Sequence, residues 1–252
     1  MSEAAERLAR RLLEARASGE RIAALPAELV PADAAQAYAV QDLVAPTLGR
    51  IGGWKVGAGS PSGEPNCAPL FAERMAASPA RFAAARFPLG GIEGELAFRF
   101  GRDLPPRVPP YDEDEVWQVI DTLHPAIELV ESRFADFRAQ DKQALLADMQ
   151  SNGAFCYGAP VKDWRRVDFL TQPASLTLDG VESARAVGGN AAGHPKRLLG
   201  WLANHLARRG RGLVAGDIVT TGTHTGLIFA KPGATATVRF PGIGEASLTL
   251  AA

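Results

Sequence analysis

Residues 90–100, GGIEGELAFRF, constrain the fold of this chain more than any other stretch. Successive side chains of a β-strand point to opposite faces of the sheet, and this stretch alternates accordingly. One face carries two carboxylates, Glu93 and Glu95, with Cα atoms roughly 6.5–7 Å apart, close enough for both to bind one hard cation. A half-exposed strand whose polar face meets water is the alternative. The other face is apolar and requires a core; it consists of Ile92, Leu96, Phe98 and Phe100.

The rest of the chain excludes several classes of partner. The formal net charge is −1 and there is no long basic block, so we expect neither nucleic acid nor an anionic membrane surface as a partner. No apolar run approaches the roughly 18–20 residues of a membrane span, and the charged N-terminal stretch lacks the apolar segment of a secretory signal. Cys67 and Cys156 lie outside any CxxC pair, which favours a reducing, cytoplasmic setting and excludes a cysteine-rich zinc site.

The first fifty residues read as helical. Residues 3–17 have the periodicity of an amphipathic helix. Asp33 is a good N-cap for a second helix, which Pro46 and Gly49 are expected to end. We therefore predict that residues 1–50 form a helical arm rather than an independent domain.

From Ile51 onward the sequence favours short strands separated by glycine and proline. Three helices are expected among them. They cover residues 116–123, where Pro125 ends the helix, residues 144–149, and residues 195–210. No internal repeat or low-complexity linker is apparent. We predict an α+β protein in which residues 51–252 form a β-rich catalytic domain with inserted helices.

A third carboxylate lies on another predicted strand. In residues 126–131, AIELVE, Glu128 shares a face with apolar neighbours. A buried carboxylate is costly unless it is paired, protonated or bound to a metal. With Glu93 and Glu95 it would complete an oxygen-only ligand set, which selects Mg²⁺ or Mn²⁺ over zinc. Open coordination positions would accept a 2-oxo acid, whose enolate the ion would stabilise as a Lewis acid.

Lys55 lies in the glycine-flanked strand GGWKVG, residues 52–57. It could place a positive charge at the substrate carboxylate or enolate oxygen. A solvated lysine at a strand edge is the alternative, and nothing around it favours a Schiff base. The glycines at 57, 59 and 63 lack a following Gly-Lys-Ser/Thr and helix, so we reject a nucleotide loop. No HExxH or GxSxG occurs.

Several ordered blocks carry a resemblance to a known family. They are GGWKVG (52–57), EGELAF (93–98), PAIELVESR (125–133), ADMQSNGAFCYG (147–158), WLANHLARRGRGLVAGDIVTTGTHTG (201–226) and KPG (231–233). From about Ile51 to the C-terminus, the chain resembles the 2-oxopent-4-enoate hydratase and 4-oxalocrotonate decarboxylase group of the fumarylacetoacetate hydrolase superfamily. The resemblance implies a mixed β-roll with inserted helices, an N-terminal helical arm, a bound Mg²⁺ or Mn²⁺ ion and an oligomer.

The resemblance also assigns residues. Glu93 and Glu95 match the family's Glu-x-Glu metal ligands, and Glu128 matches its third ligand. Lys55 matches the lysine after the first glycine strand. We expect the substrate to contact three residues, namely Ser151, Leu70 and Thr223.

Two departures from the family pattern lie near the expected site. Asn66, in Pro-Asn-Cys-Ala, occupies the catalytic position where hydratases of the family commonly have aspartate. An amide cannot transfer a proton as a carboxyl group does, which leaves the proton-transfer step open. Met149 and Gln150 replace the usual Asn-Ala, a change that would reshape the pocket.

These features predict a metal-dependent hydratase that converts a short 2-hydroxy-dienoate, through its 2-oxo-enoate form, into a 4-hydroxy-2-oxo acid. The alternatives are decarboxylation of an oxalocrotonate-like diacid, C–C bond hydrolysis, and a non-catalytic paralogue or partner subunit. We expect a small-molecule 2-oxo acid as the ligand. We also expect a homo-oligomer, with assembly onto a related subunit as a further alternative.

Overall fold

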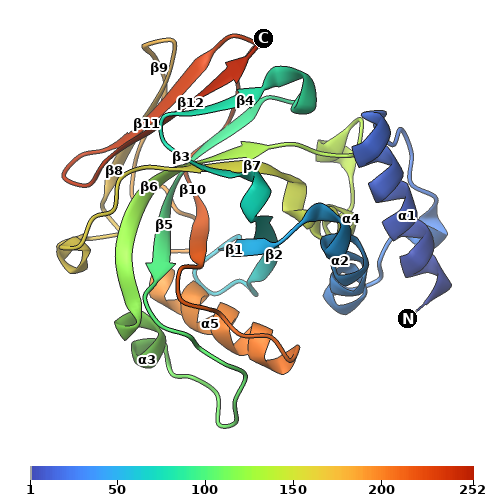
Figure 1. Cartoon of the computed structure of the whole chain (residues 1–252), viewed down its shortest axis with the longest axis horizontal. Helices are drawn as coiled ribbons and strands as arrows, with labels where there is room; N and C mark the ends of the chain where they lie inside the picture. Colours follow the sequence, from blue (N-terminus) through green and yellow to red (C-terminus); the bar gives the residue numbers. More distant parts are fainter. Residues whose placement is uncertain (1) are drawn as a thin grey trace.

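The computed structural model describes residues 2–252, which form helices and curved strands in a mixed α+β arrangement (Figure 1). The helices are α1 (Glu3–Ser18), α2 (Ala34–Leu48), α3 (Glu113–Gln118), α4 (Lys142–Ala147) and α5 (Pro195–Arg208). The strands are β1 (Ile51–Gly57), β2 (Asn66–Phe71), β3 (Met75–Ala77), β4 (Ala80–Ala83), β5 (Gly91–Phe100), β6 (Ile120–Val130), β7 (Asn152–Tyr157), β8 (Pro173–Leu178), β9 (Val181–Val187), β10 (Ile218–Phe229), β11 (Thr235–Phe240) and β12 (Gly244–Ala251).

Across residues 2–252 the strands form two mixed sheets. One is seven-stranded, in the order β2-β1-β10-β5-β6-β7-β3, and the other is five-stranded, in the order β4-β12-β11-β8-β9. Strand β1 pairs parallel with β10, and β10 pairs antiparallel with β5. Figure 1 shows β5 and β6 as long curved strands, α5 beneath the first sheet, and α1, α2 and α4 grouped at one side. The predicted α+β class with a curled mixed sheet is confirmed.

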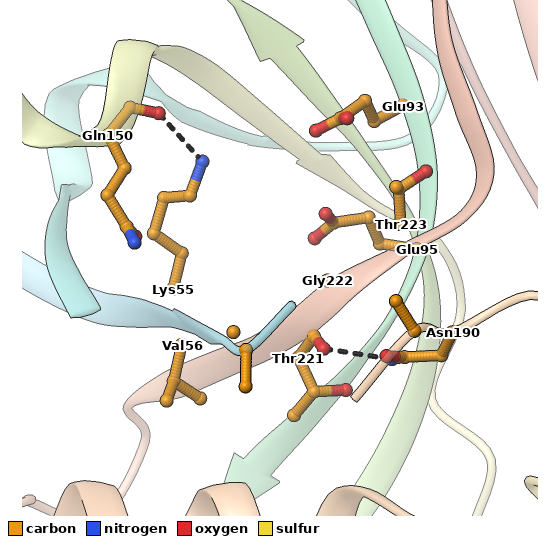
Figure 2. A pocket seen from close by; sticks show the side chains of 12 residues that line it. Lys55, Val56, Glu93, Glu95, Gln150, Asn190, Thr221, Gly222 and Thr223 are labelled. Carbon is orange, nitrogen blue, oxygen red and sulfur yellow. Dashed lines mark hydrogen bonds between the residues drawn. The ribbon is translucent and has the colours of Figure 1, made fainter. Parts of the chain in front are cut away.

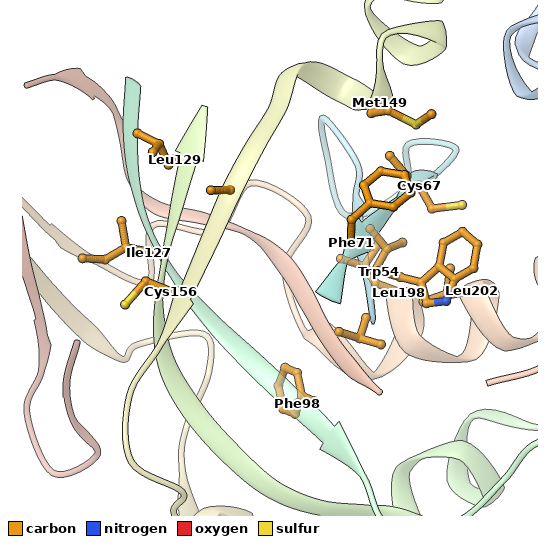
Figure 3. Packing of buried hydrophobic residues seen from close by; sticks show 14 of the residues in the cluster. Trp54, Cys67, Phe71, Phe98, Ile127, Leu129, Met149, Cys156, Leu198 and Leu202 are labelled. Atoms are coloured by element: carbon orange, nitrogen blue, oxygen red, sulfur yellow. The ribbon is translucent and has the colours of Figure 1, made fainter. Parts of the chain in front are cut away.

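The two N-terminal helices share a hydrophobic core with the strands. Leu8 and Leu12 of α1 are fully buried in the same cluster as Trp54 of β1 and Leu202 of α5. Figure 3 shows Trp54 and Leu202 among the buried side chains of this cluster. Complete burial of a leucine stabilises a fold by about 1.5–3 kcal/mol, so α1 contributes to the stability of the shared core. The predicted boundary at residue 50 falls between α2 and β1.

The second N-terminal helix begins where the sequence predicts. The Asp33 carboxylate accepts a hydrogen bond from the Gln36 backbone N–H at 2.9 Å, which caps α2. Pro46 lies inside the last turn, and the helix continues to Leu48. Gly49 follows with a φ of 119°, which favours glycine over residues with a side chain. Within residues 2–252, no helix is long and apolar enough to cross a membrane.

The predicted helix over residues 116–123 is correct only at its start, because a helix is present but is shorter than predicted. Helix α3 ends at Gln118, and Ile120 already belongs to β6, which pairs with β5 along its whole length. Long-range pairing therefore overrides a local helical period. The Pro125 carbonyl accepts a hydrogen bond from the Gly158 N–H at 2.8 Å, so the missing N–H of Pro125 would also face the β7 side. Pro125 is tolerated inside β6 because this position lies beyond the last paired residue of β7.

Candidate active site

Three carboxylates meet on one face of the seven-stranded sheet. Glu93 and Glu95 alternate along β5 and share a face, and Glu128 of β6 lies directly opposite Glu93 in the antiparallel register. One carboxylate oxygen from each residue lies within 4.8 Å of the other two. Glu95 and Glu128 are buried, and Glu93 is partly exposed. Strand alternation and register together produce the convergence.

The glycine between the two β5 carboxylates has a packing role. A Cβ atom at Gly94 would lie 2.6 Å from the Cγ2 atom of Val238 in β11. The Gly94 N–H also donates to the Thr225 hydroxyl at 2.9 Å. A side chain at residue 94 would therefore push the second sheet away from β5, so the Glu-Gly-Glu sequence suits both faces of the strand.

Lys55 extends from β1 toward the carboxylates. Its Nζ atom donates to both oxygens of Glu128, at 2.6 and 2.7 Å, and to the Gln150 carbonyl at 3.1 Å. Strand β1 approaches β10 so closely that a Cβ at Gly53 would lie 2.0 Å from the Ile218 carbonyl oxygen. Because β1 lies between β2 and β10, Lys55 is not on a sheet edge. Its side chain is only 15% exposed.

The site holds more negative than positive charge. Burial, with the nearby Glu128 carboxylate, raises the pKa of Glu93 to about 7. Burial and the other two carboxylates raise the pKa of Glu95 well above its usual value. Burial would lower the pKa of Lys55, but the field of the carboxylates outweighs it and the pKa is raised. Three carboxyl groups thus face one ammonium, an arrangement that an added cation would stabilise.

Neighbouring side chains orient these carboxylates. The Asn152 Nδ2 atom donates to Glu128 Oε1 at 3.0 Å, and the Thr220 hydroxyl donates to Glu95 Oε2. Oxygen-only donors of this kind match the preference of hard divalent cations. The carboxylates, their close spacing and their excess charge fit a divalent cation.

A cavity of about 250 Å³ opens beside the carboxylates. Figure 2 shows Lys55 and Gln150 on one side of it, facing Glu93 and Glu95 across the open space. Thr223 belongs to its wall. The lining consists of Lys55, Val56, Gly57, Ala58, Glu93, Glu95, Gln150, Asn190, Ala191, Thr221, Gly222 and Thr223. The cavity is large enough for a short organic acid.

The structure separates the other predicted residues from this wall. Asn66 lies on β2, where its Oδ1 atom accepts a hydrogen bond from the Gln150 side chain. Ser151 is buried, and its carbonyl accepts from the Glu131 N–H at 2.8 Å. Leu70 is fully buried in a small apolar cluster. Contact of Ser151 and Leu70 with a substrate therefore remains a prediction.

The turn at residues 149–151, which positions Gln150, has a role that the sequence alone did not reveal. Met149, Gln150 and Ser151 have φ values of 54°, 50° and 56°, a left-handed conformation that costs roughly 1–2 kcal/mol per residue. The turn points the Gln150 carbonyl at Lys55 and the Gln150 side chain at Asn66. The departure from the family pattern at residues 149–150 was the available signal, but it did not reveal the strained backbone.

Comparison with known proteins agrees with the geometry. Residues 61–251 match the family described as fumarylacetoacetate (FAA) hydrolase C-terminal. The chain is 32% identical to a 2-keto-4-pentenoate hydratase of Paraburkholderia phymatum over 251 residues, covering 95% of each chain. A 2-keto-4-pentenoate hydratase of Burkholderia vietnamiensis is 29% identical over 253 residues, covering 96% of this chain and 95% of the relative.

A solved structure is similar over nearly the whole length. The 4-oxalocrotonate decarboxylase of Pseudomonas putida G7, complexed with magnesium and adipate, superposes with a TM-score of 0.85 at 25% identity, covering 97% of this chain and 96% of that one. The resemblance noted from the sequence blocks is confirmed. The chain belongs to the fumarylacetoacetate hydrolase family.

Proposed function

We propose that this protein is a divalent-cation-dependent hydratase, a lyase that adds water to a short 2-hydroxy-dienoate, through its 2-oxo-enoate form, to give a 4-hydroxy-2-oxo acid. The observation that carries the proposal is the cluster of Glu93, Glu95 and Glu128, which faces Lys55 at the edge of a small cavity. The relatives named as 2-keto-4-pentenoate hydratases support this reaction class.

Glu93, Glu95 and Glu128 would hold the cation. When bound, Mg²⁺ would supply a Lewis acid for the 2-oxo acid and its enolate. Magnesium is preferred because the similar decarboxylase structure contains it, and Mn²⁺ is the alternative with the same oxygen preference. Asn152 and Thr220 hold two of the carboxylates in place before any ligand binds.

Lys55 supplies the fixed positive charge of the site. It is charged at neutral pH because the carboxylates raise its pKa, and the Gln150 carbonyl holds its Nζ atom near the cavity. A substrate carboxylate or enolate oxygen entering the cavity would gain a charge-assisted hydrogen bond from this ammonium. The walls near Thr223 and Asn190 offer polar contacts to the rest of the acid.

Proton transfer is the step in which this chain departs from the family pattern. Asn66 is hydrogen-bonded to Gln150 and cannot exchange a proton as a carboxyl group does. Among the described residues that line the cavity, the titratable groups are Lys55, Glu93 and Glu95. Ketonisation moves the proton of the 2-hydroxyl group to carbon, and hydration then adds the hydroxyl and proton of one water across the double bond. Because Glu93 and Glu95 would be occupied by the cation, Lys55 and solvent carry the protons.

The paired amides of Asn66 and Gln150 favour one second candidate, decarboxylation of an oxalocrotonate-like diacid. Loss of CO₂ passes through the same enolate and needs no group that activates water. The structural similarity to a 4-oxalocrotonate decarboxylase supports it. C–C bond hydrolysis and a non-catalytic partner subunit rank lower, and the complete set of three carboxylates argues against the latter.

Turnover of 2-hydroxypenta-2,4-dienoate by the purified protein with Mg²⁺ or Mn²⁺ tests the proposal. Loss of the dienol absorbance together with formation of the 4-hydroxy-2-oxo acid is expected. Release of CO₂ from 4-oxalocrotonate without hydration would favour the decarboxylase. No turnover of either compound by a protein that still binds Mg²⁺ would favour the partner subunit.

A metal-affinity measurement tests the ligand assignment separately. Glu93→Gln should weaken Mg²⁺ binding, whereas Glu182→Gln, in an exposed ion pair with Arg185, should leave it unchanged. Equal Mg²⁺ affinity of the Glu93 variant and the wild type would contradict the assignment of Glu93 as a ligand.

We also propose that the protein acts in the cytoplasm as a homo-oligomer. The cytoplasmic assignment rests on the scarcity of cysteine: Cys67 and Cys156 are free and buried. The oligomeric state rests on the family resemblance alone. Light scattering of the purified protein tests it, and a mass equal to the 26.6 kDa chain would contradict it.

A further inference from the structure

A second cavity, of about 370 Å³, lies beyond the end of β6 and shares no lining residue with the candidate active site. It is bounded by the C-terminal end of α1, by residues 85–88 and by residues 131–133. The Ile22 N–H donates to the Arg133 carbonyl at 2.7 Å, which fixes the segment after α1 against the segment after β6. The arginines of its wall are Arg16, Arg21, Arg74, Arg86 and Arg133.

Both carboxylates of this region already form ion pairs with arginines. Glu131 accepts from Arg21 at 2.7 Å and from the Leu89 backbone N–H at 2.8 Å. Asp148, behind the wall, accepts from Arg16 at 3.0 Å and from Arg133 at 2.5 Å.

Two arginines therefore lack a partner. Within residues 2–252 the ion pairs of this wall use Arg16, Arg21 and Arg133, and neither Arg74 nor Arg86 has one. Arg74 lies at the end of a 3-10 turn after β2, and Arg86 at the end of another turn after β4. Positive charge from two separate segments is thus unbalanced at one cavity.

Arg16 adds a third positive charge to the cavity wall. Its side chain is only 7% exposed, and it is one of the residues that line the cavity. Burial, together with the neighbouring Arg133, lowers the pKa of Arg16 to about 9, so it remains charged at neutral pH. A charged group that is buried to this extent is costly unless its charge is balanced, and Asp148 is shared between Arg16 and Arg133.

These arginines could instead only neutralise the C-terminal end of α1 and the two carboxylates. The end of α1 is already capped, because the Gly19 N–H donates to the Ala15 carbonyl at 3.0 Å. Neutralisation also does not account for Arg74 and Arg86, which have no carboxylate partner within residues 2–252. An anion bound in the cavity accounts for both.

We propose that this cavity binds a small, doubly charged oxyanion through Arg16, Arg74 and Arg86. Guanidinium groups bind phosphate and carboxylate oxygens through paired N–H donors, and the cavity volume exceeds that of one such ion. Inorganic phosphate and short dicarboxylates both present this chemistry. The proposal does not depend on the proposed function of the first cavity.

Titration calorimetry with the full-length protein tests the proposal, using inorganic phosphate in one arm and succinate in the other. Sodium chloride at equal ionic strength controls for screening of surface charge. We expect saturable binding of at least one dianion. Binding of phosphate alone identifies a phosphate site, and binding of succinate identifies a dicarboxylate site. No saturable binding in either arm overturns the proposal.

A pair of matched variants locates the binding. Arg74→Gln/Arg86→Gln should weaken binding at least tenfold, and it should fold because neither side chain is ion-paired. Arg81→Gln/Arg166→Gln removes the same charge from exposed positions elsewhere and should change affinity less than twofold. Equal loss in both variants would mean non-specific attraction. If the wild type binds no dianion and the Arg74/Arg86 variant lowers the oligomeric mass, the cavity is an interface between copies, and the proposal is wrong.

Discussion

Two charge clusters of opposite sign meet near the end of β6, where Glu128 belongs to one and Glu131 and Arg133 belong to the other. The acidic cluster is Glu93, Glu95 and Glu128 with Lys55, and the basic cluster is the five arginines around the second cavity with Glu131 and Asp148. Carboxyl groups relieve unbalanced charge by taking up protons, as the raised pKa of Glu93 indicates. Guanidinium groups cannot do so near neutral pH. The basic cluster therefore needs an anion or solvent to balance its charge, whereas protons can neutralise the acidic cluster until its cation binds.

A short segment connects the two clusters. Asp148 is held by Arg16 and Arg133, and two residues later the Gln150 carbonyl holds Lys55. The left-handed residues lie between and beside these anchors. Such a conformation persists only where its surroundings determine it. We infer that the Asp148 contacts hold in place the turn on which the position of Lys55 depends.

Breaking the acidic cluster should have the largest effect. Glu128→Gln removes one proposed ligand charge and the partner of Lys55 at once. We expect kcat/KM with Mg²⁺ to fall by about a thousandfold or more, because the variant loses both cation affinity and the orientation of the ammonium. Steady-state kinetics measure this loss. A Glu128 variant within tenfold of the wild type, beside an unaffected Glu182→Gln control, would contradict the assignment.

Breaking the basic cluster should reduce stability before it reduces activity. Asp148→Asn leaves Arg16 and Arg133 buried without a counter-charge, and we expect a loss of about 3 kcal/mol in the free energy of unfolding. Urea denaturation measures it. The exposed pair of Glu115 with Arg107 is the control, because Glu115→Gln should cost less than about 1 kcal/mol. Equal effects of both substitutions would show that the Asp148 network is not structurally important.

The stability and the Mg²⁺ affinity of the acidic cluster should both depend on pH. The raised pKa values of Glu93 and Glu95 mean that the metal-free folded protein binds protons more tightly than the unfolded chain. Its stability should therefore fall as pH rises from about 4.5 through about 7. Mg²⁺ must displace these two protons, so its affinity should fall by up to about a hundredfold for each pH unit below 7, a factor of about ten for each proton.

Calorimetry at several pH values measures this slope. In Glu93→Gln the proton of Glu93 is gone, so the slope should become shallower. An Mg²⁺ affinity that is independent of pH between 5 and 7 in the wild type would contradict the raised pKa values.

The smallest effect concerns the amide pair at the rim of the acidic cluster. Asn66→Asp supplies a carboxyl group beside Gln150, and we expect it to raise the hydration rate about threefold while leaving Mg²⁺ affinity unchanged. Asn66→Ala, which removes the amide without adding a carboxyl group, is the matched control and should not raise it. Product analysis by chromatography separates hydration from decarboxylation. If the ratio of hydration to decarboxylation product is unchanged in both variants, Asn66 takes no part in the reaction.

Local patterns in the sequence determined much of this protein. Period-two alternation identified the β5 strand with Glu93 and Glu95 on one face, and the cap at Asp33 identified the start of α2. The ordered family blocks predicted the mixed β-roll, which the comparisons bear out. These features depend on a few consecutive residues or on sequence blocks characteristic of a family, so they can be identified from the sequence of a single chain.

The tertiary structure alone decided which distant residues meet. Antiparallel register placed Glu128 opposite Glu93 and made residues 120–123, predicted as helix, part of strand β6. The three left-handed residues that aim the Gln150 carbonyl at Lys55 have no local signature, because packing rather than propensity maintains them. The arginines of the second cavity come from four separate parts of the chain. Each of these arrangements depends on contacts between residues far apart in sequence, and periodicity carries no information about such contacts.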